Sequence, residues 1–191
     1  MVRGQVIDAG KVAEIAAPAA LIIAHNANFD RKFVEKVFEV FSTKAWACSM
    51  SQVRWAEESF ESTKLEYLAM KSGFFYDGHR AAVDCNAAIE LLSRPLPKSG
   101  TLALLALLEE ARKPTCRIWA EGAPYDFKDI LKARRYRWSD GNNGKPRSWY
   151  RDVPEDDLEA ELSYLRKDIF QRDVDLAVVR ITAFDRFSER V

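Results

Sequence analysis

Two patterns of hydrophobic and polar positions alternate along residues 1–95. The run Ala20–Ala24 is continuously apolar and leads into a polar turn, as in a strand buried on both faces. From Asp30 to Phe41, apolar residues recur at helical spacing and predict an amphipathic helix. Ala45–Ser49 is expected to form a second buried strand. Further helices are expected at residues 10–17, 62–73 and 79–92. This alternation predicts an α/β layer domain.

A Pro-containing break at residues 94–97 ends that domain. Residues 96–116 are expected to form a helical connection, in which a Leu-rich helix from Thr101 to Lys113 either closes the first domain or bridges to the next. The pattern over residues 117–191 then predicts strand, helix, strand, strand, helix and strand, an order that resembles a split β-α-β unit. The two middle strands flank the Gly- and Asn-rich loop Ser139–Arg147, as hairpin strands do. The sequence therefore predicts a small α+β accessory domain at its end.

Composition limits the classes to which the chain can belong. Of its 191 residues, 48% are hydrophobic and 30% charged, which is typical of a globular protein. The 29 basic and 29 acidic residues cancel, which excludes a uniformly basic nucleic-acid coat but not a local basic surface. No apolar stretch approaches the roughly 20 residues of a membrane span, and no signal-peptide core follows Met1. With 3 cysteines and no C-x-x-C spacing, we expect a cytoplasmic protein with reduced thiols.

Two motifs contain the 2 histidines of the chain. The first, His25–Asp30 with the sequence HNANFD, follows a predicted buried strand and opens a helix. The second, Gly78–Asp84 with the sequence GHRAAVD, opens another helix. Alone, such a histidine is commonly a packing residue and such an aspartate a helix cap. Together the motifs resemble the second and third motifs of DEDDh 3′–5′ exonucleases, the family typified by the epsilon-type proofreading subunit of bacterial DNA polymerase III.

The resemblance implies a ribonuclease H-like fold for residues 1–95 and removal of nucleotides from the 3′ ends of DNA or RNA. Two Mg²⁺ or Mn²⁺ ions about 4 Å apart would support hydrolysis of the phosphodiester, and such hard cations take carboxylate ligands. Matched by position, Asp30 and Asp84 would be catalytic metal ligands, and His79 would be the general base, for which the usual imidazole pKa of about 6.5 is suitable. The residues expected to contact substrate are Asn26, Phe29 and Arg80. His25 is expected to be structural.

The first motif of that family, D-x-E on the opening strand, has no counterpart in this sequence. The acids before His25 are Asp8 and Glu14, which do not form D-x-E. Because that motif supplies two of the four metal-binding carboxylates in the family, we expect weak metal binding and little or no activity from this chain, which lacks the first strands of the fold. An exposed sheet edge would then favour self-association. The alternative is a catalytically inactive nucleic-acid-binding or protein-docking module.

A basic and aromatic stretch lies in the predicted accessory domain. Residues 126–151 contain 8 basic and 3 acidic residues, a net charge of +5, interleaved with tyrosine and tryptophan. This composition is typical of a surface that stacks bases and follows phosphates. The candidate contact residues are Lys132, Arg134, Arg135, Arg137, Trp138 and Trp149. The alternative is that the aromatic side chains form the domain's own core. The expected partners are single-stranded DNA or RNA 3′ ends, with a DNA polymerase as a further candidate.

Overall fold

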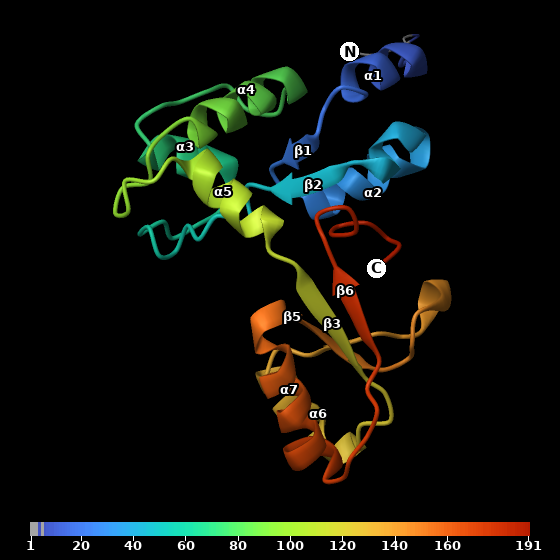
Figure 1. Cartoon of the computed structure of the whole chain (residues 1–191). Helices are drawn as coiled ribbons and strands as arrows, with labels where there is room; N and C mark the ends of the chain where they lie inside the picture. The colour runs from blue at the N-terminus through green and yellow to red at the C-terminus, as the bar shows by residue number, and fades with distance from the viewer. Residues whose placement is uncertain (1–3, 5) are drawn as a thin grey trace. The chain divides into compact units, whose positions relative to one another are not determined.

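The structure, a computed structural model, describes residue 4 and residues 6–191, apart from the side chain of Asn143. The chain divides into two compact units (Figure 1). The first unit comprises Met1–Arg112 together with Ala183–Val191, and the second comprises Lys113–Thr182. No helix in the described residues is long and apolar enough to cross a membrane.

The first unit has mixed α/β structure, which confirms the expected class. Its two strands, β1 (Leu21–Ala24) and β2 (Ala45–Cys48), pair in parallel (Figure 1). Parallel pairing requires a crossover connection, and the amphipathic segment between the strands supplies it. Its helices are α1 (Ala9–Ala16), α2 (Ala27–Val37), a 3₁₀ helix at Glu39–Thr43, α3 (Leu65–Lys71), α4 (Ala81–Leu92) and α5 (Ala103–Arg112).

The main core of the first unit lies between β2 and the helices α3, α4 and α5. Trp55, Leu68, Leu91 and Leu107 are almost completely buried there. Of the two roles expected for the helix in residues 96–116, α5 has that of closing the first domain, since Ala103, Leu107 and Ala111 are buried in this core and the division between the units follows Arg112. Removing this apolar face from water stabilises the packing of α5, whereas Leu104 and Leu105 on the same helix remain exposed.

The C-terminal segment, residues 183–191, belongs to the first unit. The backbone N–H of Trp46 donates to the first carbonyl of this segment over 2.8 Å. The guanidinium of Arg31, which is fully buried, donates to Glu35 over 2.6 Å. It also donates to the carbonyls of Ala183, Phe184 and Arg186. The accessory domain, expected to continue to the end of the chain, therefore stops at Thr182.

The second unit has the expected order of strands and helices. Its elements are β3 (Thr115–Ala120), a 3₁₀ turn at Tyr125–Phe127, α6 (Lys128–Ala133), β4 (Arg137–Trp138), a 3₁₀ turn at Asn142–Gly144, β5 (Trp149–Pro154), a 3₁₀ turn at Glu155–Asp157, α7 (Leu158–Tyr164), a π-helical extension at Leu165–Phe170, and β6 (Val178–Ile181). The strand order is β4-β5-β3-β6, and every neighbouring pair is antiparallel. Because β5 lies between β3 and β4, the unit has the topology of a split β-α-β fold.

The two helices of the second unit cover one face of its sheet (Figure 1). Alternate residues of β3, namely Cys116, Ile118 and Ala120, pack against this helical layer. The intervening Arg117 and Trp119 face the other side of the sheet, as the two-residue period of a strand requires. The sheet thus separates an apolar face from a face that carries charged and aromatic side chains.

Candidate functional site

The first sequence motif forms the turn between β1 and α2. Asn26 occupies the N-cap position of α2 in the left-handed region, with φ 87° and ψ 48°, which asparagine tolerates better than most residues. Asp30 follows in the first turn of α2 and is half-buried. Burial raises the pKa of the Asp30 carboxyl above its ordinary value, and a backbone hydrogen bond and nearby His25 oppose this shift only in part. In this turn the loss of hydration of the Asp30 carboxylate is therefore only partly replaced by interactions with the protein.

His25 is a structural residue of the same turn, as expected from the sequence. Its Nε2 lies 2.8 Å from the carbonyl oxygen of Thr63, and its Nδ1 lies 2.9 Å from the Ser49 hydroxyl. Because a carbonyl only accepts, this arrangement assigns the proton to Nε2 and makes Nδ1 the acceptor of the Ser49 O–H. Burial lowers the pKa of the imidazole, in spite of the Thr63 carbonyl and Asp30. A neutral His25 thus joins the ends of β1 and β2 to the loop before α3.

The second motif gathers polar side chains around Gly78, before α4. His79 has φ +67°, and its side chain is 93% exposed, with Nε2 3.5 Å from a carboxylate oxygen of Glu66. A Cβ atom at Gly78 would lie 2.9 Å from Glu66 Oε1 and 3.7 Å from Asp84 Oδ1. Asp84 lies in the first turn of α4. Glycine at this position therefore allows the two carboxylates to approach the same stretch of backbone.

Tyr76 and Glu66 extend this cluster beyond the residues that the motif indicated. Burial raises the pKa of the Tyr76 phenol, and the negative charges of Asp84 and Glu66 raise it further. Glu66 comes from α3, so no local pattern in the second motif points to it. The apolar spacing of residues 62–73 predicted the helix but carries no signal for which polar side chain faces the Gly78 loop.

The two motifs are not joined by a direct contact. Within the described residues, no hydrogen bond or ion pair links Asp30 to His79 or Asp84. Nor do three His, Cys, Asp or Glu side chains gather as a metal site in that part of the chain. Asp30 and Asp84 on their own are therefore not a complete ligand set for Mg²⁺ or Mn²⁺, which take about six ligands, chiefly oxygen.

Phe29 and Arg80, which were expected to contact substrate, lie on the surface of the first unit. The Phe29 side chain is 58% exposed, and its ring centroid lies 4.8 Å from that of Phe33. Arg80 is the N-cap residue of α4 and is exposed, with its nearest carboxylate, Asp77, 3.8 Å away. That separation is too long for a hydrogen bond. Both side chains are therefore accessible to a ligand.

The basic residues that were expected to form one patch lie on different faces of the second unit. Arg137 lies over the Tyr150 ring and 3.4 Å from Asp152, on the sheet face opposite the helices. Arg134 instead forms a two-pronged ion pair with Glu161 of α7, with both N–O distances 2.9 Å. Lys132 is exposed on α6. A single surface containing all of the expected contact residues is therefore not formed.

The two tryptophans expected in that patch contact each other. Trp138 and Trp149 are cross-strand neighbours on β4 and β5, with ring centroids 5.5 Å apart and planes at 70°. Trp149 also packs at the border of the buried core. Trp138 is 51% exposed. The alternative of a core role therefore applies to Trp149, whereas Trp138 has surface available for a ligand.

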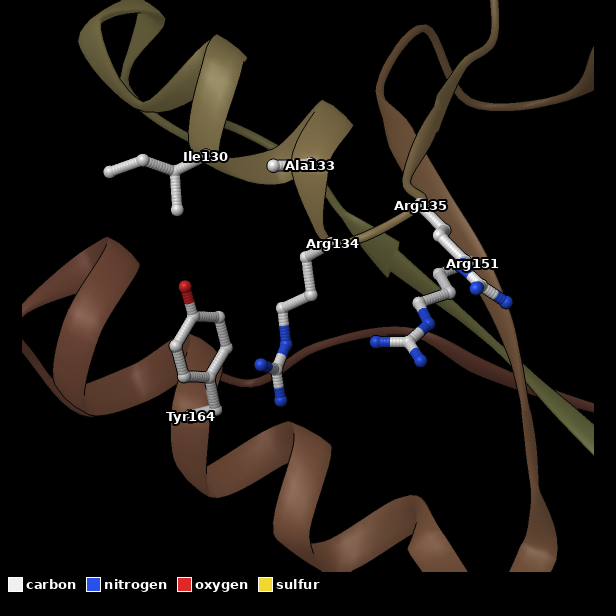
Figure 2. A pocket seen from close by; sticks show the side chains of 6 residues that line it. All are labelled: Ile130, Ala133, Arg134, Arg135, Arg151 and Tyr164. Atoms are coloured by element: carbon white, nitrogen blue, oxygen red, sulfur yellow. The ribbon is translucent and has the colours of Figure 1, made fainter.

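A hollow of 510 Å³ lies between α6, α7 and β5 in the second unit (Figure 2). Its lining residues are Ile130, Ala133, Arg134, Arg135, Arg151 and Tyr164. Figure 2 shows the Tyr164 ring beside Arg134, the Arg151 side chain directed toward Arg134, and the Arg135 side chain extending away from Tyr164 at the edge of the hollow. The guanidinium carbon of Arg134 lies 3.7 Å from the centre of that ring. The hollow is thus cationic, with an aromatic and aliphatic wall.

The described residues form two candidate functional sites. One is the Gly78 cluster with Asp30 in the first unit, and the other is the arginine-lined hollow in the second. Comparison with protein-family models, characterised proteins and solved structures gives no match to this chain.

Proposed function

We propose that the first unit is part of a 3′–5′ exonuclease of the DEDDh type, with a ribonuclease H-like fold, which removes nucleotides from DNA or RNA 3′ ends. The observation that carries this proposal is the cluster around Gly78, in which His79 and Asp84 of one motif lie with Glu66. The parallel β1–β2 pair, with Asp30 in the turn that leaves β1, supports it further. Polar side chains in loops and helix starts after parallel strands are a common arrangement in α/β enzymes.

His79 is the general base of the proposed reaction. Its imidazole is 93% exposed, so that a water molecule beside a bound 3′ end has access to it. Its left-handed backbone is uncommon for a residue with a Cβ, and such strain is concentrated at functional sites. Glu66 Oε1 lies 3.5 Å from Nε2 and is the neighbour that we assign to orienting the ring. The proposed residues therefore separate into a base and a neighbour that orients it.

The proposed hydrolysis uses Mg²⁺ or Mn²⁺, for which this chain supplies Asp30 and Asp84 as candidate ligands. When bound, such ions neutralise charge on the phosphate and the leaving oxygen. The described residues do not form a complete ligand set, and the sequence contains no D-x-E motif before His25. We therefore propose that full activity requires a D-x-E segment, and that this chain retains little activity without it.

The test is the stepwise shortening of a 5′-labelled single-stranded DNA or RNA in Mn²⁺. This chain is compared with a version extended by the sequence encoded upstream of Met1. We expect the extended version to release mononucleotides from the 3′ end and the present chain to release few. In the extended version, Asp84→Ala should abolish release and His79→Ala should reduce it about 10²–10⁴-fold, the usual contribution of a general base.

Glu57→Gln is the matched control, because Glu57 is an exposed carboxylate whose partner is Arg54. We expect this variant to keep the activity of the extended version. The proposal fails if the upstream sequence encodes no D-x-E, or if a folded extended version with D-x-E leaves both substrates intact. Full activity of the present chain, abolished by Asp84→Ala, would retain the exonuclease and contradict the need for the missing motif.

The second candidate function is a catalytically inactive nucleic-acid-binding or docking module. The observation that favours it is that no three His, Cys, Asp or Glu side chains of the described residues gather as a metal site, since a nuclease site must bring several carboxylates to the same metal ions. Calorimetric titration of the extended version with Mn²⁺ distinguishes the two. Binding of two ions supports the nuclease, whereas retained single-strand binding without metal binding supports the module.

A further inference from the structure

We propose that the arginine-lined hollow of the second unit is a binding site for the phosphate group of a nucleotide or nucleic-acid strand. The site lies within one compact unit and uses none of the residues of the proposed nuclease. Its volume, 510 Å³, is in the range of small-molecule sites and exceeds what an inorganic anion alone requires. The proposal therefore holds whether or not the first unit hydrolyses nucleic acid.

The charge of the hollow is only partly neutralised by the protein itself. Arg134 and Arg151 both donate to the carboxylate of Glu161, which is buried. Tyr136 donates its hydroxyl to the same carboxylate over 2.9 Å. Each oxygen of Glu161 accepts two of these four hydrogen bonds, so the carboxylate has no capacity left for Arg135. One negative charge among three guanidinium groups leaves a net charge of +2.

Free donors accompany this excess charge. In the described part of the chain, the guanidinium of Arg135 has no hydrogen-bond or ion-pair partner, and Arg151 uses only Nη1. A phosphate has three or four oxygens that accept charge-assisted hydrogen bonds, and planar guanidinium groups match that geometry. The unpaired donors of the hollow therefore complement a phosphate group.

The two paired arginines are held rigidly. Arg134 is fixed by its two bonds to Glu161 and by the Tyr164 ring against its guanidinium plane. Arg151 is fixed by the same carboxylate over 3.1 Å. A site whose donors are already ordered loses less conformational entropy on binding. Glu161 therefore organises the hollow rather than competing for all of its charge.

Arg135 occupies a backbone position that favours glycine. The N–H of Arg135 donates to Lys132 and that of Tyr136 to Leu131, which is the hydrogen-bond pattern of a Schellman motif at the end of α6. Arg135 is the left-handed residue of this motif, with φ +67°. Glycine usually takes this place because it has no Cβ to clash. An arginine that is strained, unpaired and part of the lining of a cationic hollow is consistent with selection for binding.

The test measures binding of a fluorescein-labelled oligo(dT) strand by anisotropy, over a range of salt concentrations, for the whole chain. We expect Arg135→Gly to weaken binding about tenfold, as for one lost charge-assisted contact. The slope of log K against log salt should fall by about 0.7, the value for one phosphate contact on a single strand. The melting temperature of this variant should not fall, because glycine relieves the left-handed strain.

Arg172→Gly is the matched control, since Arg172 is an exposed arginine of the same unit outside the hollow. It should leave affinity and salt slope unchanged. Competition with inorganic phosphate and with a nucleoside monophosphate identifies which kind of ligand supplies the bound phosphate group. Displacement of the strand by millimolar monophosphate supports a nucleotide site, and displacement only by unlabelled strand supports a backbone phosphodiester. Unchanged binding in Arg135→Gly, or an equal loss in Arg172→Gly, overturns the proposal.

Discussion

Each unit is held together around a buried charge, but the two charges have opposite sign. In the first unit, fully buried Arg31 donates to backbone carbonyls of the C-terminal segment and to Glu35. In the second unit, buried Glu161 accepts hydrogen bonds from Arg134, Arg151 and a tyrosine. A guanidinium, with its fork of donors, orders irregular main chain, whereas a carboxylate orders side chains from several elements.

The comparison separates the charges that build the fold from those available for chemistry. Arg31 and Glu161 are buried and have all of their strong hydrogen-bonding directions occupied or nearly so. His79 and Arg135 are exposed and share a strained left-handed backbone, each with φ +67°. Strained backbone of this kind is concentrated at functional sites, which makes His79 and Arg135 candidates for chemistry.

The largest effect that the comparison predicts is that of Arg31→Ala on the first unit. The substitution leaves three carbonyls and Glu35 without their buried donor. We expect the free energy of unfolding of the first unit to fall by about 3–5 kcal/mol, as when one partner of a buried pair is removed. Amide hydrogen exchange should show lost protection in β1, β2 and α2, while β3 and β5 remain protected.

Two further variants test whether the stability depends on the several N–H donors of the Arg31 guanidinium. Arg31→Lys should recover little of the loss, because a single ammonium group cannot reach all of the carbonyls that the guanidinium contacts. Arg80→Ala removes an exposed arginine whose nearest carboxylate is 3.8 Å away and should leave stability within about 0.5 kcal/mol. If β3 and β5 lose protection together with β1 and β2, the two units do not fold as separate cooperative blocks.

The same contrast explains how far the sequence predicts the fold. The order of strands and helices in the second unit is correctly predicted, and the signal is clearest where alternate residues are buried, as Cys116, Ile118 and Ala120 are in β3. The helix predicted to start at His79 instead starts at Ala81, because His79 adopts a left-handed φ that hydrophobic periodicity does not encode. The helix predicted from Asp30 starts earlier, at Ala27, since Asn26 makes the turn from β1 very short.

Features that depend on distant parts of the chain could not be predicted in this way. Arg31 lies in a helix with an ordinary amphipathic pattern, and the carbonyls to which it donates follow more than 150 residues later. Glu66 likewise approaches His79 only through the packing of α3 against α4. The motifs indicated His79 and Asp84 because their spacing is local, whereas residues that meet through tertiary packing leave no such signal.

Glu161→Gln tests the second buried charge and is expected to have the next largest effect. Burial raises the pKa of Glu161, but hydrogen bonds from Arg134 and Tyr136 and the charge of Arg151 outweigh it, so that the pKa lies below the ordinary value of 4.5. Because the folded pKa is below the unfolded one, this carboxylate stabilises the second unit above pH about 4.5. That contribution is lost as the pH falls through the folded pKa.

The variant should lower the free energy of unfolding of the second unit by about 2 kcal/mol at pH 7, the usual worth of hydrogen bonds to a charged group. As the pH falls below 4.5 and through the lowered pKa of folded Glu161, the wild type should approach the variant, since its own carboxylate becomes protonated. Urea denaturation at several pH values measures both. Glu159→Gln, at an exposed position on the same helix, should show neither effect. A constant difference between wild type and Glu161→Gln at all pH values would mean that the charge of Glu161 is not what holds the arginines.

The smallest effect is expected at His79 and Arg135, two of the left-handed residues outside glycine. His79→Gly and Arg135→Gly each remove a Cβ strain of about 1–2 kcal/mol and add roughly 0.5–1 kcal/mol of chain entropy to the unfolded state. Each should therefore raise stability by about 0.5 kcal/mol, or the melting temperature by about 2–3 °C. Asn26→Gly should gain less, because asparagine already tolerates its φ of 87°. A loss of stability in His79→Gly or Arg135→Gly would show that the side chain contributes to the fold, and would place that residue with Arg31 and Glu161 rather than among the residues kept for chemistry.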